Sequence, residues 1–205
     1  MVTATQTATI QLVFDGSLTP IDLDILQGLW SDEQYLRLTE ATNRLVEFTD
    51  GQIEVLPMPT DKHQAIIEEL LMRLREFIRP RGGVVRSLAL RLRVRPDKYR
   101  EPDLLALRDR DDPRRANRLW RGADLVVEIV SPDNPERDTQ VKRQDYAEGG
   151  VPEYWIVNPL DATITVLHLA GDAYVEHGVF RRGDTATSLA LPGFAVAVDA
   201  VLDAD

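Results

Sequence analysis

The 205-residue sequence predicts a mixed α/β (α+β) fold whose core runs helix, strand, strand, strand, helix, strand. An amphipathic helical pattern over residues 60–78 precedes three strand patterns. Two nearly continuous apolar runs, 124–130 and 151–157, indicate strands buried on both faces, with a helix between them. We therefore expect a single domain, with an N-terminal helix and hairpin extension (1–59), a core (60–158), and a C-terminal hairpin and tail (159–205).

Composition narrows the class of protein. Apolar residues make up 43% of the chain and charged residues 28%, which is typical of a globular protein. No apolar run reaches the roughly 18 residues of a membrane span, and residues 1–6 lack the pattern of a secretion signal, so a cytoplasmic location is expected. The absence of cysteine excludes disulfides and Cys-ligated zinc or iron–sulfur sites.

The charge is distributed unevenly. The chain carries a net charge of −10, yet residues 73–121 hold 16 Lys/Arg against 7 Asp/Glu, a local excess of +9. These arginines either solvate one face of the protein or form a basic strip that holds a phosphate backbone through counterion release.

The N-terminal extension contains weak alternation over residues 1–19, which predicts an edge strand or an arm, and then a helical pattern over residues 20–42. Ser31 and Gln34 have the spacing of a capping box. Residues 44–56 predict a hairpin whose two-residue turn is Asp50–Gly51.

The predicted core starts with the helix over residues 60–78, which ends at Pro80, Gly82 and Gly83. His63 lies in its first turn, where a histidine is either a cap or surface residue or a proton-transfer group. Residues 84–95 alternate as one strand. One side of this strand carries the candidate nucleic-acid contacts Arg91, Arg93 and Arg95.

The second half of the core follows in order. A returning strand is expected at 99–107, a polar loop at 108–123 and the buried strand at 124–130. Asn134 and Pro135 suit the start of a helix that runs to about residue 148 and ends at Gly149–Gly150. A second hairpin over 163–180 has its turn at Gly171–Asp172, and 189–202 is an apolar tail.

Glu128 is the strongest indication of chemistry, because it is ionisable and lies within the apolar run 125–130. A buried carboxylate needs a cation, a proton or strong hydrogen-bond donors. It is either paired with an arginine or bound to a metal. Oxygen ligands in a protein without cysteine suit Mg²⁺ or Mn²⁺ better than zinc.

Asp103 and Lys142 are candidates for the same site as Glu128. Asp103 follows Pro102 at a strand entrance, where it is either a turn residue or a second carboxylate converging on the same end of the sheet. Lys142 stands four residues after Asp138, the spacing of an exposed helical ion pair, yet Tyr146 continues this face and could direct Lys142 toward Glu128.

In combination these motifs resemble the Uma-two family of putative restriction endonucleases, within the PD-(D/E)xK nuclease superfamily. The resemblance covers about residue 26 to the C-terminal tail, and is carried by the following segments: Glu101–Pro102–Asp103, Val126 to Pro132, Arg137–Asp138 with Lys142 and Tyr146, Gly150 to Val157, Glu47 to Gly51, Met58–Pro59, and His63.

This resemblance implies a restriction-endonuclease-like core in which Asp103 and Glu128 bind the metal and Lys142 is the lysine of the site. The superfamily places a lysine two residues after the glutamate, where this chain has Val130. The resemblance to the family implies that the lysine comes from the helix instead, as Lys142. Glu47 and His63 match family positions and are candidates for supporting the site or relaying protons.

The leading hypothesis is a Mg²⁺- or Mn²⁺-dependent endonuclease. Asp103, Glu128 and the Ile129 carbonyl would hold the ion, Lys142 would orient water or stabilise charge on phosphate, and His63 would assist proton transfer. The alternatives are a non-catalytic nucleic-acid-binding or assembly module and a glycoside hydrolase using the two carboxylates. The expected partner is nucleic acid, and DNA is preferred to RNA. A homodimer is expected by analogy, because paired sites would suit double-strand cleavage.

Overall fold

The computed structural model describes residues 9–14, 17–22, 26–42 and 44–205. The chain divides into two compact units, the first comprising residues 1–57 and 96–98 and the second residues 58–95 and 99–205. Within the described ranges, no helix is both long and apolar enough to cross a membrane.

The first unit begins with strands β1 (Thr9–Phe14) and β2 (Ser17–Asp22), which pair antiparallel. Helix α1 (Asp32–Ala41) starts at Ser31, whose capping box with Gln34 is confirmed. The prediction of a helix over 20–42 is therefore wrong in its first part, since Pro20 pairs with Gln11 in a hairpin. Residues 23–25 lie outside the described ranges.

The predicted hairpin at residues 44–56 is confirmed as β3 (Val46–Thr49) and β4 (Gln52–Val55). Both turn residues have positive φ, 48° at Asp50 and 83° at Gly51, as the favoured two-residue hairpin turn requires. A Cβ added at Gly51 would lie 2.7 Å from the carbonyl oxygen of Gly28. Glycine is thus required here both by the backbone angle and by the close approach of a neighbouring segment.

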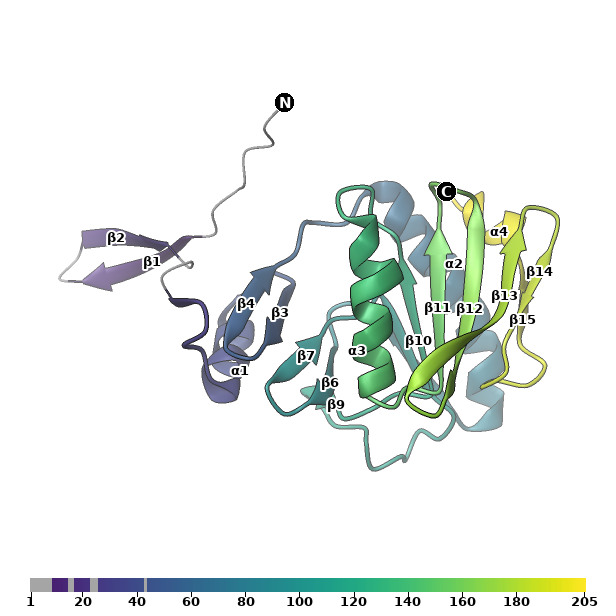
Figure 1. Ribbon diagram of the computed structural model, residues 1–205, viewed down its shortest axis with the longest axis horizontal. Coiled ribbons are helices and arrows are strands. Elements are labelled where there is room, and N and C mark those ends of the chain that lie inside the picture. Colours follow the sequence, from purple (N-terminus) through teal and green to yellow (C-terminus); the bar gives the residue numbers. More distant parts are fainter. Residues whose placement is uncertain (1–8, 15–16, 23–25, 43) are drawn as a thin grey trace. The chain divides into compact units, whose positions relative to one another are not determined.

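The second unit is built on a six-stranded mixed sheet with the order β13-β12-β11-β10-β8-β5 (Figure 1). Strand β10 is parallel to β11, while the other pairs in this sheet are antiparallel. In chain order the strands are β5 (Val84–Ser87), β8 (Leu104–Leu107), β10 (Leu125–Ile129), β11 (Glu153–Asn158), β12 (Thr163–Ala170) and β13 (Ala173–Arg181).

Each face of this sheet has its own apolar core. One face packs against α2 (Asp61–Ile78) and the C-terminal segment through residues such as Leu70, Val127 and Trp155. The opposite face buries Val126 and Tyr154 together with Tyr146 of helix α3 (Lys142–Glu148). Strand β10 is buried along its whole length and β11 at every residue except Asn158, which confirms the two-sided burial predicted from their apolar runs.

Helix α2 follows the sequence pattern closely. The hydroxyl of Thr60 caps its N-terminus by accepting the His63 N–H, and its apolar stripe is buried. The second core helix departs from prediction in one respect, because a π-helical turn, η3 (Arg137–Val141), precedes α3. This turn rotates the residues that follow it relative to a regular helix.

The predicted strand over residues 84–95 is wrong as a single element. Strand β5 ends at Ser87 beside β8, and β6 (Arg91–Arg95) then pairs in parallel with β9 (Leu119–Trp120). Alternation along one strand predicts Leu88 and Leu90 on the same side, yet Leu88 packs against the core that contains α2 and Leu90 against the core on the opposite face of the sheet. The returning strand is likewise divided, into β7 (Lys98–Arg100) and β8.

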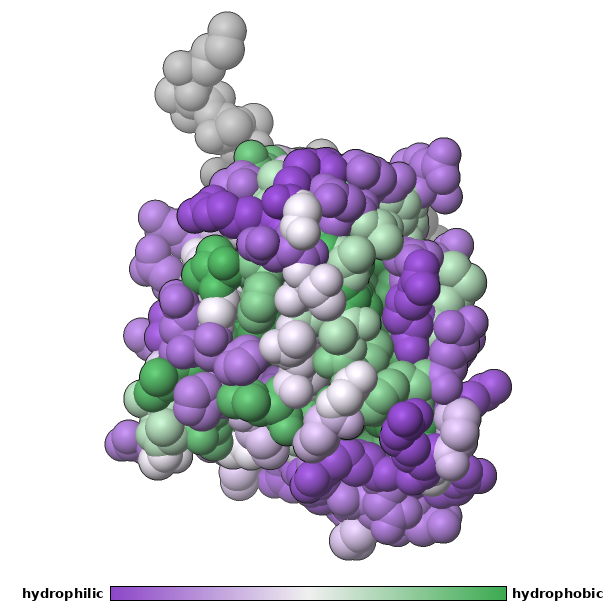
Figure 2. All heavy atoms as spheres, turned by 90° about the vertical axis from the view of Figure 1, so that its right-hand side faces the viewer, coloured by the Kyte–Doolittle hydropathy of each residue, from purple (hydrophilic) through white to green (hydrophobic). Residues whose placement is uncertain are grey.

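The C-terminal part contains the predicted hairpin, β12 and β13, followed by β14 (Thr185–Thr187), β15 (Ala195–Ala197) and helix α4 (Val198–Leu202). Buried Glu153 accepts hydrogen bonds from the Leu189 and Ala190 backbone at 2.6 and 2.8 Å, which fixes the tail to β11. Figure 2 views this side of the unit, where hydrophobic and weakly polar residues cover much of the middle and hydrophilic residues gather above and below them. Val175 and Val179 of β13 are among the exposed apolar side chains.

Candidate active site

The register of two adjacent strands brings the predicted carboxylates together. Strands β8 and β10 pair antiparallel with Val127 opposite Leu104, and continuing this register by one residue places Glu128 opposite Asp103. A hydrogen bond crosses at this point, since the Ile129 N–H donates to Asp103 Oδ2 at 2.7 Å. The convergence of the two acids at one end of the sheet, which the sequence only suggested, is therefore a consequence of strand pairing.

Glu128 is 2% exposed and held by partners from the helix that follows its strand. Its Oε2 atom lies 2.9 Å from Lys142 Nζ, and its Oε1 atom accepts a hydrogen bond from the hydroxyl of Tyr146. Because a buried carboxylate needs charge compensation or strong donors, these two contacts explain how β10 carries an acid between aliphatic neighbours.

Lys142 is 4% exposed and bridges two carboxylates. Besides its contact with Glu128, Nζ lies 3.1 Å from Oδ1 of Asp138, one helical turn earlier. The ion pair between Asp138 and Lys142 thus exists, but the interpretation as an exposed, solvated pair is wrong, since both residues are buried. The π-helical turn that ends at Val141 immediately precedes the lysine.

His63 joins the cluster from the start of α2. Its Nε2 atom lies 3.2 Å from Asp103 Oδ2, the same oxygen that accepts the Ile129 N–H. The histidine is therefore part of the site rather than a surface residue of the helix. Its Nδ1 atom is buried and has no hydrogen-bond partner among the described residues.

The electrostatic surroundings of His63 favour the imidazolium form. Burial lowers the pKa of His63, but the hydrogen bond to Asp103 and the charge of that carboxylate raise it, as do the Ile129 backbone and the more distant charge of Asp138. The net effect raises the pKa above its ordinary value. His63 thus holds a proton more tightly than a free histidine, and it lies beside Asp103 and Ile129, two of the three predicted metal ligands.

Tyr154 lies close enough to Asp103, Glu128 and Asp138 for all three carboxylates to affect its hydroxyl. Its hydroxyl donates to the backbone carbonyl of Asp138 at 2.7 Å. Burial and the negative charges of Glu128, Asp138 and Asp103 raise the pKa of this tyrosine well above its ordinary value. The phenol therefore stays neutral and acts as a fixed hydrogen-bond donor next to the acidic cluster.

The donor set suits a hard divalent cation. Three carboxylates (Asp103, Glu128 and Asp138) lie together with the ammonium of Lys142 and the imidazole of His63. Within residues 26–42 and 44–205, no three His, Cys, Asp or Glu side chains form a ready metal cage. Mg²⁺ does not need one, because it usually keeps several waters and binds through one or two carboxylates.

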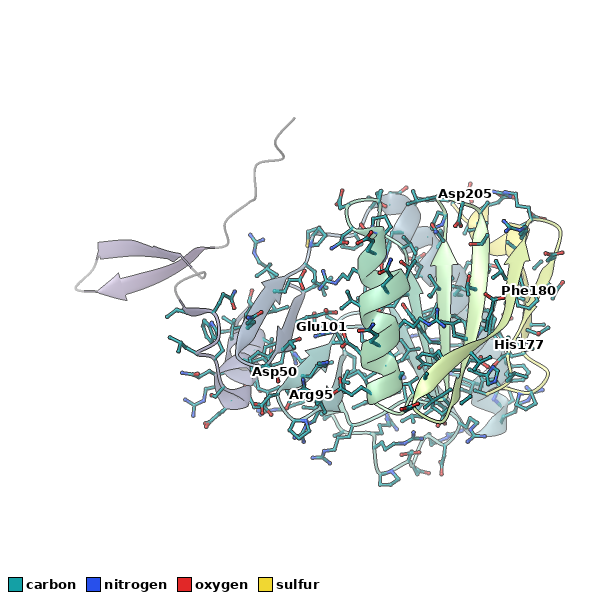
Figure 3. The ribbon with its side chains drawn as sticks, in the orientation of Figure 1. Asp50, Arg95, Glu101, His177, Phe180 and Asp205 are labelled. Carbon is teal, nitrogen blue, oxygen red and sulfur yellow. The ribbon has the colours of Figure 1, made fainter. Side chains whose placement is uncertain are left out.

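The other predicted residues are Glu47 and three arginines. Glu47 is buried on β3 of the first unit. Arg91 Nε lies 3.5 Å from Oε1 of the buried Glu101, and Arg95 Nε lies 2.7 Å from Glu148 Oε1; Figure 3 labels Arg95 and Glu101. Arg93, between them, is half-buried, and its Nε atom has no hydrogen-bond partner within the described part of the chain. Two of the three arginines expected to contact nucleic acid therefore already have acidic partners.

The structure adds members that sequence reasoning did not assign to the site. From the sequence, Asp138 is the ion-pair partner of Lys142 and Tyr146 continues its helical face. The spacing 138, 142 and 146 contained the signal, since residues four apart share one helical face. What the spacing could not show is that this face lies toward Glu128 rather than toward solvent.

The arrangement of the second unit defines a class of fold. A mixed sheet with helices on both faces, and with an aspartate and a glutamate on adjacent strands near a lysine, is the architecture of the restriction-endonuclease-like nucleases. A crystal structure described as a putative nuclease belonging to DUF820, from Anabaena variabilis ATCC 29413, shares this fold with a TM-score of 0.72 and 21% sequence identity. The similarity covers 85% of this chain and 98% of that chain.

Sequence comparison identifies the family. The family model Uma2, described as "Putative restriction endonuclease", matches residues 32–199. The chain belongs to this family, which confirms the resemblance drawn from its motifs. No curated protein matches the chain at a significant level.

Proposed function

We propose that the protein is a metal-dependent endonuclease whose active site comprises Asp103, Glu128, Lys142 and His63. The observation that carries this proposal is the buried contact between Lys142 Nζ and Glu128 Oε2 at 2.9 Å. The superfamily pattern expects a lysine at the position of Val130, and Lys142 supplies an ammonium group to the same carboxylate from the neighbouring helix.

The metal would be held by Asp103, Glu128 and the Ile129 carbonyl, as Mg²⁺ or Mn²⁺. When bound, such an ion lowers the pKa of a coordinated water and polarises a phosphate oxygen. The contacts of the protein support this assignment. The Ile129 N–H fixes the orientation of Asp103, and the Tyr146 hydroxyl fixes that of Glu128, so both carboxylates are held in place before substrate arrives.

Lys142 and His63 have separate roles in this proposal. The ammonium of Lys142 stabilises negative charge that develops on the phosphate during attack. His63, whose imidazolium is favoured by Asp103, holds a proton at the edge of the site and can donate it toward a departing oxygen. Glu47 remains a candidate for a supporting role through its family position.

The test is cleavage of supercoiled plasmid DNA by purified protein with Mg²⁺ or Mn²⁺. We expect nicking by the wild type, and a loss of at least about 100-fold in Glu128→Gln and Asp103→Asn, because each change removes charge from the proposed metal site. Arg182→Gln is the matched control, since its ion pairs with Asp199 and Asp203 are exposed and lie on the C-terminal segment. Equal nicking by the wild type and Glu128→Gln would overturn the proposal.

A non-catalytic nucleic-acid-binding module is the second candidate. The observation that favours it is Val130, because loss of the usual lysine can leave a binding fold without turnover. It predicts salt-dependent DNA binding with no cleavage in any divalent metal. The preference for DNA over RNA, the cytoplasmic location and the homodimer also remain proposals; light scattering on purified protein tests the last of these directly.

A further inference from the structure

Beside the acidic cluster, the second unit contains a cavity of about 510 Å³ that the proposed catalytic chemistry does not use. Arg86 of β5 lines it together with Arg110 and Arg115 from the loop between β8 and β9. The segment Ser87 to Leu90, where the chain leaves the sheet, forms another part of its wall. The cavity is thus formed at the point where the strand predicted over 84–95 is interrupted.

None of these three arginines forms an ion pair with the described part of the chain. Their guanidinium groups donate to backbone carbonyls instead: Arg86 to Val85 at 2.9 Å, Arg110 to Gly82 at 3.2 Å and Arg115 to Arg110 at 2.6 Å. A carbonyl positions a guanidinium but does not neutralise it. The side chains are therefore held in place with their charges uncompensated.

The neighbouring Arg114 shows the contrast. Arg114 Nη2 lies 2.7 Å from Asp112 Oδ2 and 2.7 Å from Asp124 Oδ1. Asp112 also lines the cavity, but because it is paired with Arg114 it does not neutralise Arg86, Arg110 or Arg115. Asp111 is the other acid in the lining, and it is exposed. The cavity therefore carries an excess of positive charge.

Other arginines add to the positive charge around Arg86. Burial, and then the like charges of Arg115, Arg75 and Arg79, lower the pKa of Arg86 from its ordinary value. Like charges gathered without a partner repel one another in the free protein. An anion bound among them would relieve that repulsion.

The cavity lies close along the sheet to the proposed catalytic acids. Arg86 pairs with Leu105 in the β5–β8 ladder, two residues from Asp103 on the partner strand. Two residues of strand span about 7 Å. The Leu88 N–H, from the cavity wall, donates to the backbone carbonyl of Asp103 at 3.2 Å.

We propose that the cavity lined by Arg86, Arg110 and Arg115 binds a backbone phosphate of the nucleic acid whose cleaved phosphodiester lies at the Asp103–Glu128 cluster. This inference rests on the proposed function. It assigns substrate contact to different arginines from those that the sequence indicated, because Arg91 and Arg95 face acids. Arginine suits the role, since its planar guanidinium forms paired hydrogen bonds with phosphate oxygens.

The test is binding of a fluorescein-labelled 20-base-pair DNA duplex in EDTA, measured by anisotropy over a series of KCl concentrations. The variant is Arg86→Gln with Arg115→Gln. We expect its dissociation constant at about 100 mM KCl to rise at least 10-fold, and the slope of log K against log [KCl] to become shallower by about 0.9, because one phosphate contact is lost.

The matched control is Arg73→Gln with Arg182→Gln, which removes the same net charge from arginines that are paired with acids. We expect it to change the dissociation constant less than 2-fold. Thermal melting of both double variants checks that they are folded. An unchanged slope in the Arg86/Arg115 variant, or an equal loss in the control, would overturn the inference.

Plasmid nicking with Mg²⁺, measured in parallel, separates this inference from the proposed function. Nicking by the wild type together with an unchanged salt slope in the Arg86/Arg115 variant contradicts the phosphate cavity alone. If the Arg86/Arg115 variant has a shallower salt slope but the wild type nicks no plasmid in any divalent metal, the result contradicts cleavage. It supports phosphate binding by the cavity in a non-catalytic binding module. Absence of DNA binding by the wild type contradicts both.

Discussion

Removing the positive charge of Lys142 should destabilise the second unit strongly. The ammonium lies 2.9 Å from Glu128 and 3.1 Å from Asp138, and all three side chains are at most 6% exposed. At an effective dielectric constant of about 20, each contact is worth roughly 5–6 kcal/mol of attraction, most of it offset by the cost of taking the charges out of water. Lys142→Met removes the attraction and leaves both carboxylates buried.

Breaking a buried pair in this way costs about 3–5 kcal/mol of unfolding free energy. For a domain of this size that corresponds to a fall in Tm of roughly 6–20 °C. Urea denaturation followed by circular dichroism measures the change, and Arg182→Met, which breaks an exposed pair, should remain close to the wild type. A Lys142→Met protein as stable as the wild type would refute the reasoning that Lys142 compensates these two acids.

The same variant links stability to cation binding. With Lys142 gone, the acidic cluster has lost one of its own cations, so Mg²⁺ should stabilise Lys142→Met more than it stabilises the wild type. Binding to the folded state alone adds about 2.7 kcal/mol when the ion is present at about 100 times its dissociation constant. Equal effects of Mg²⁺ on the two proteins would show that the ion does not bind beside Lys142.

Three further changes have expected results that stability measurements can check. Glu153→Ala should cost about 3 kcal/mol or more, because it leaves several buried donors without an acceptor while the acidic cluster is untouched. Gly51→Ala should cost about 1–3 kcal/mol, since its φ is 83° and a Cβ would lie 2.7 Å from Gly28. Tyr146→Phe should cost about 1–3 kcal/mol by removing the hydroxyl that donates to buried Glu128.

Features set by local chemistry could be predicted from the sequence. The Ser31 capping box, the Asp50–Gly51 turn and the α2 helix starting at Thr60 all appear where the pattern indicated. Each depends on residues no more than a few positions apart, or on one continuous apolar stripe. The apolar run around Glu128 likewise predicted a strand buried on both faces.

Features set by distant pairing could not be predicted in the same way. Alternation continues through Leu88 and Leu90, yet the chain changes pairing partners there, from β8 to β9, which no local pattern records. The i,i+4 spacing of Asp138 and Lys142 is the same on an exposed and on a buried helical face. Only the packing of α3 against the sheet decides that Lys142 meets Glu128.

The sequence therefore predicts four residues of the candidate site, but neither their contacts nor the membership of Asp138 and Tyr146. Asp103, Glu128, Lys142 and His63 do gather in one unit, joined by the contacts described above. The arginines show the opposite case. The sequence located a basic region correctly by charge, but which of its members are neutralised depends on the acids that the fold brings beside them.

The central claim is that the cluster of Asp103 and Glu128 binds a divalent cation, and Mn²⁺ binding followed by electron paramagnetic resonance tests it most directly. Titration of the wild type should remove the free-ion signal in proportion to protein, and Asp103→Asn combined with Glu128→Gln should abolish this binding while Arg182→Gln retains it. Equal Mn²⁺ binding by the wild type and the double variant, or no binding by the wild type, would contradict the claim.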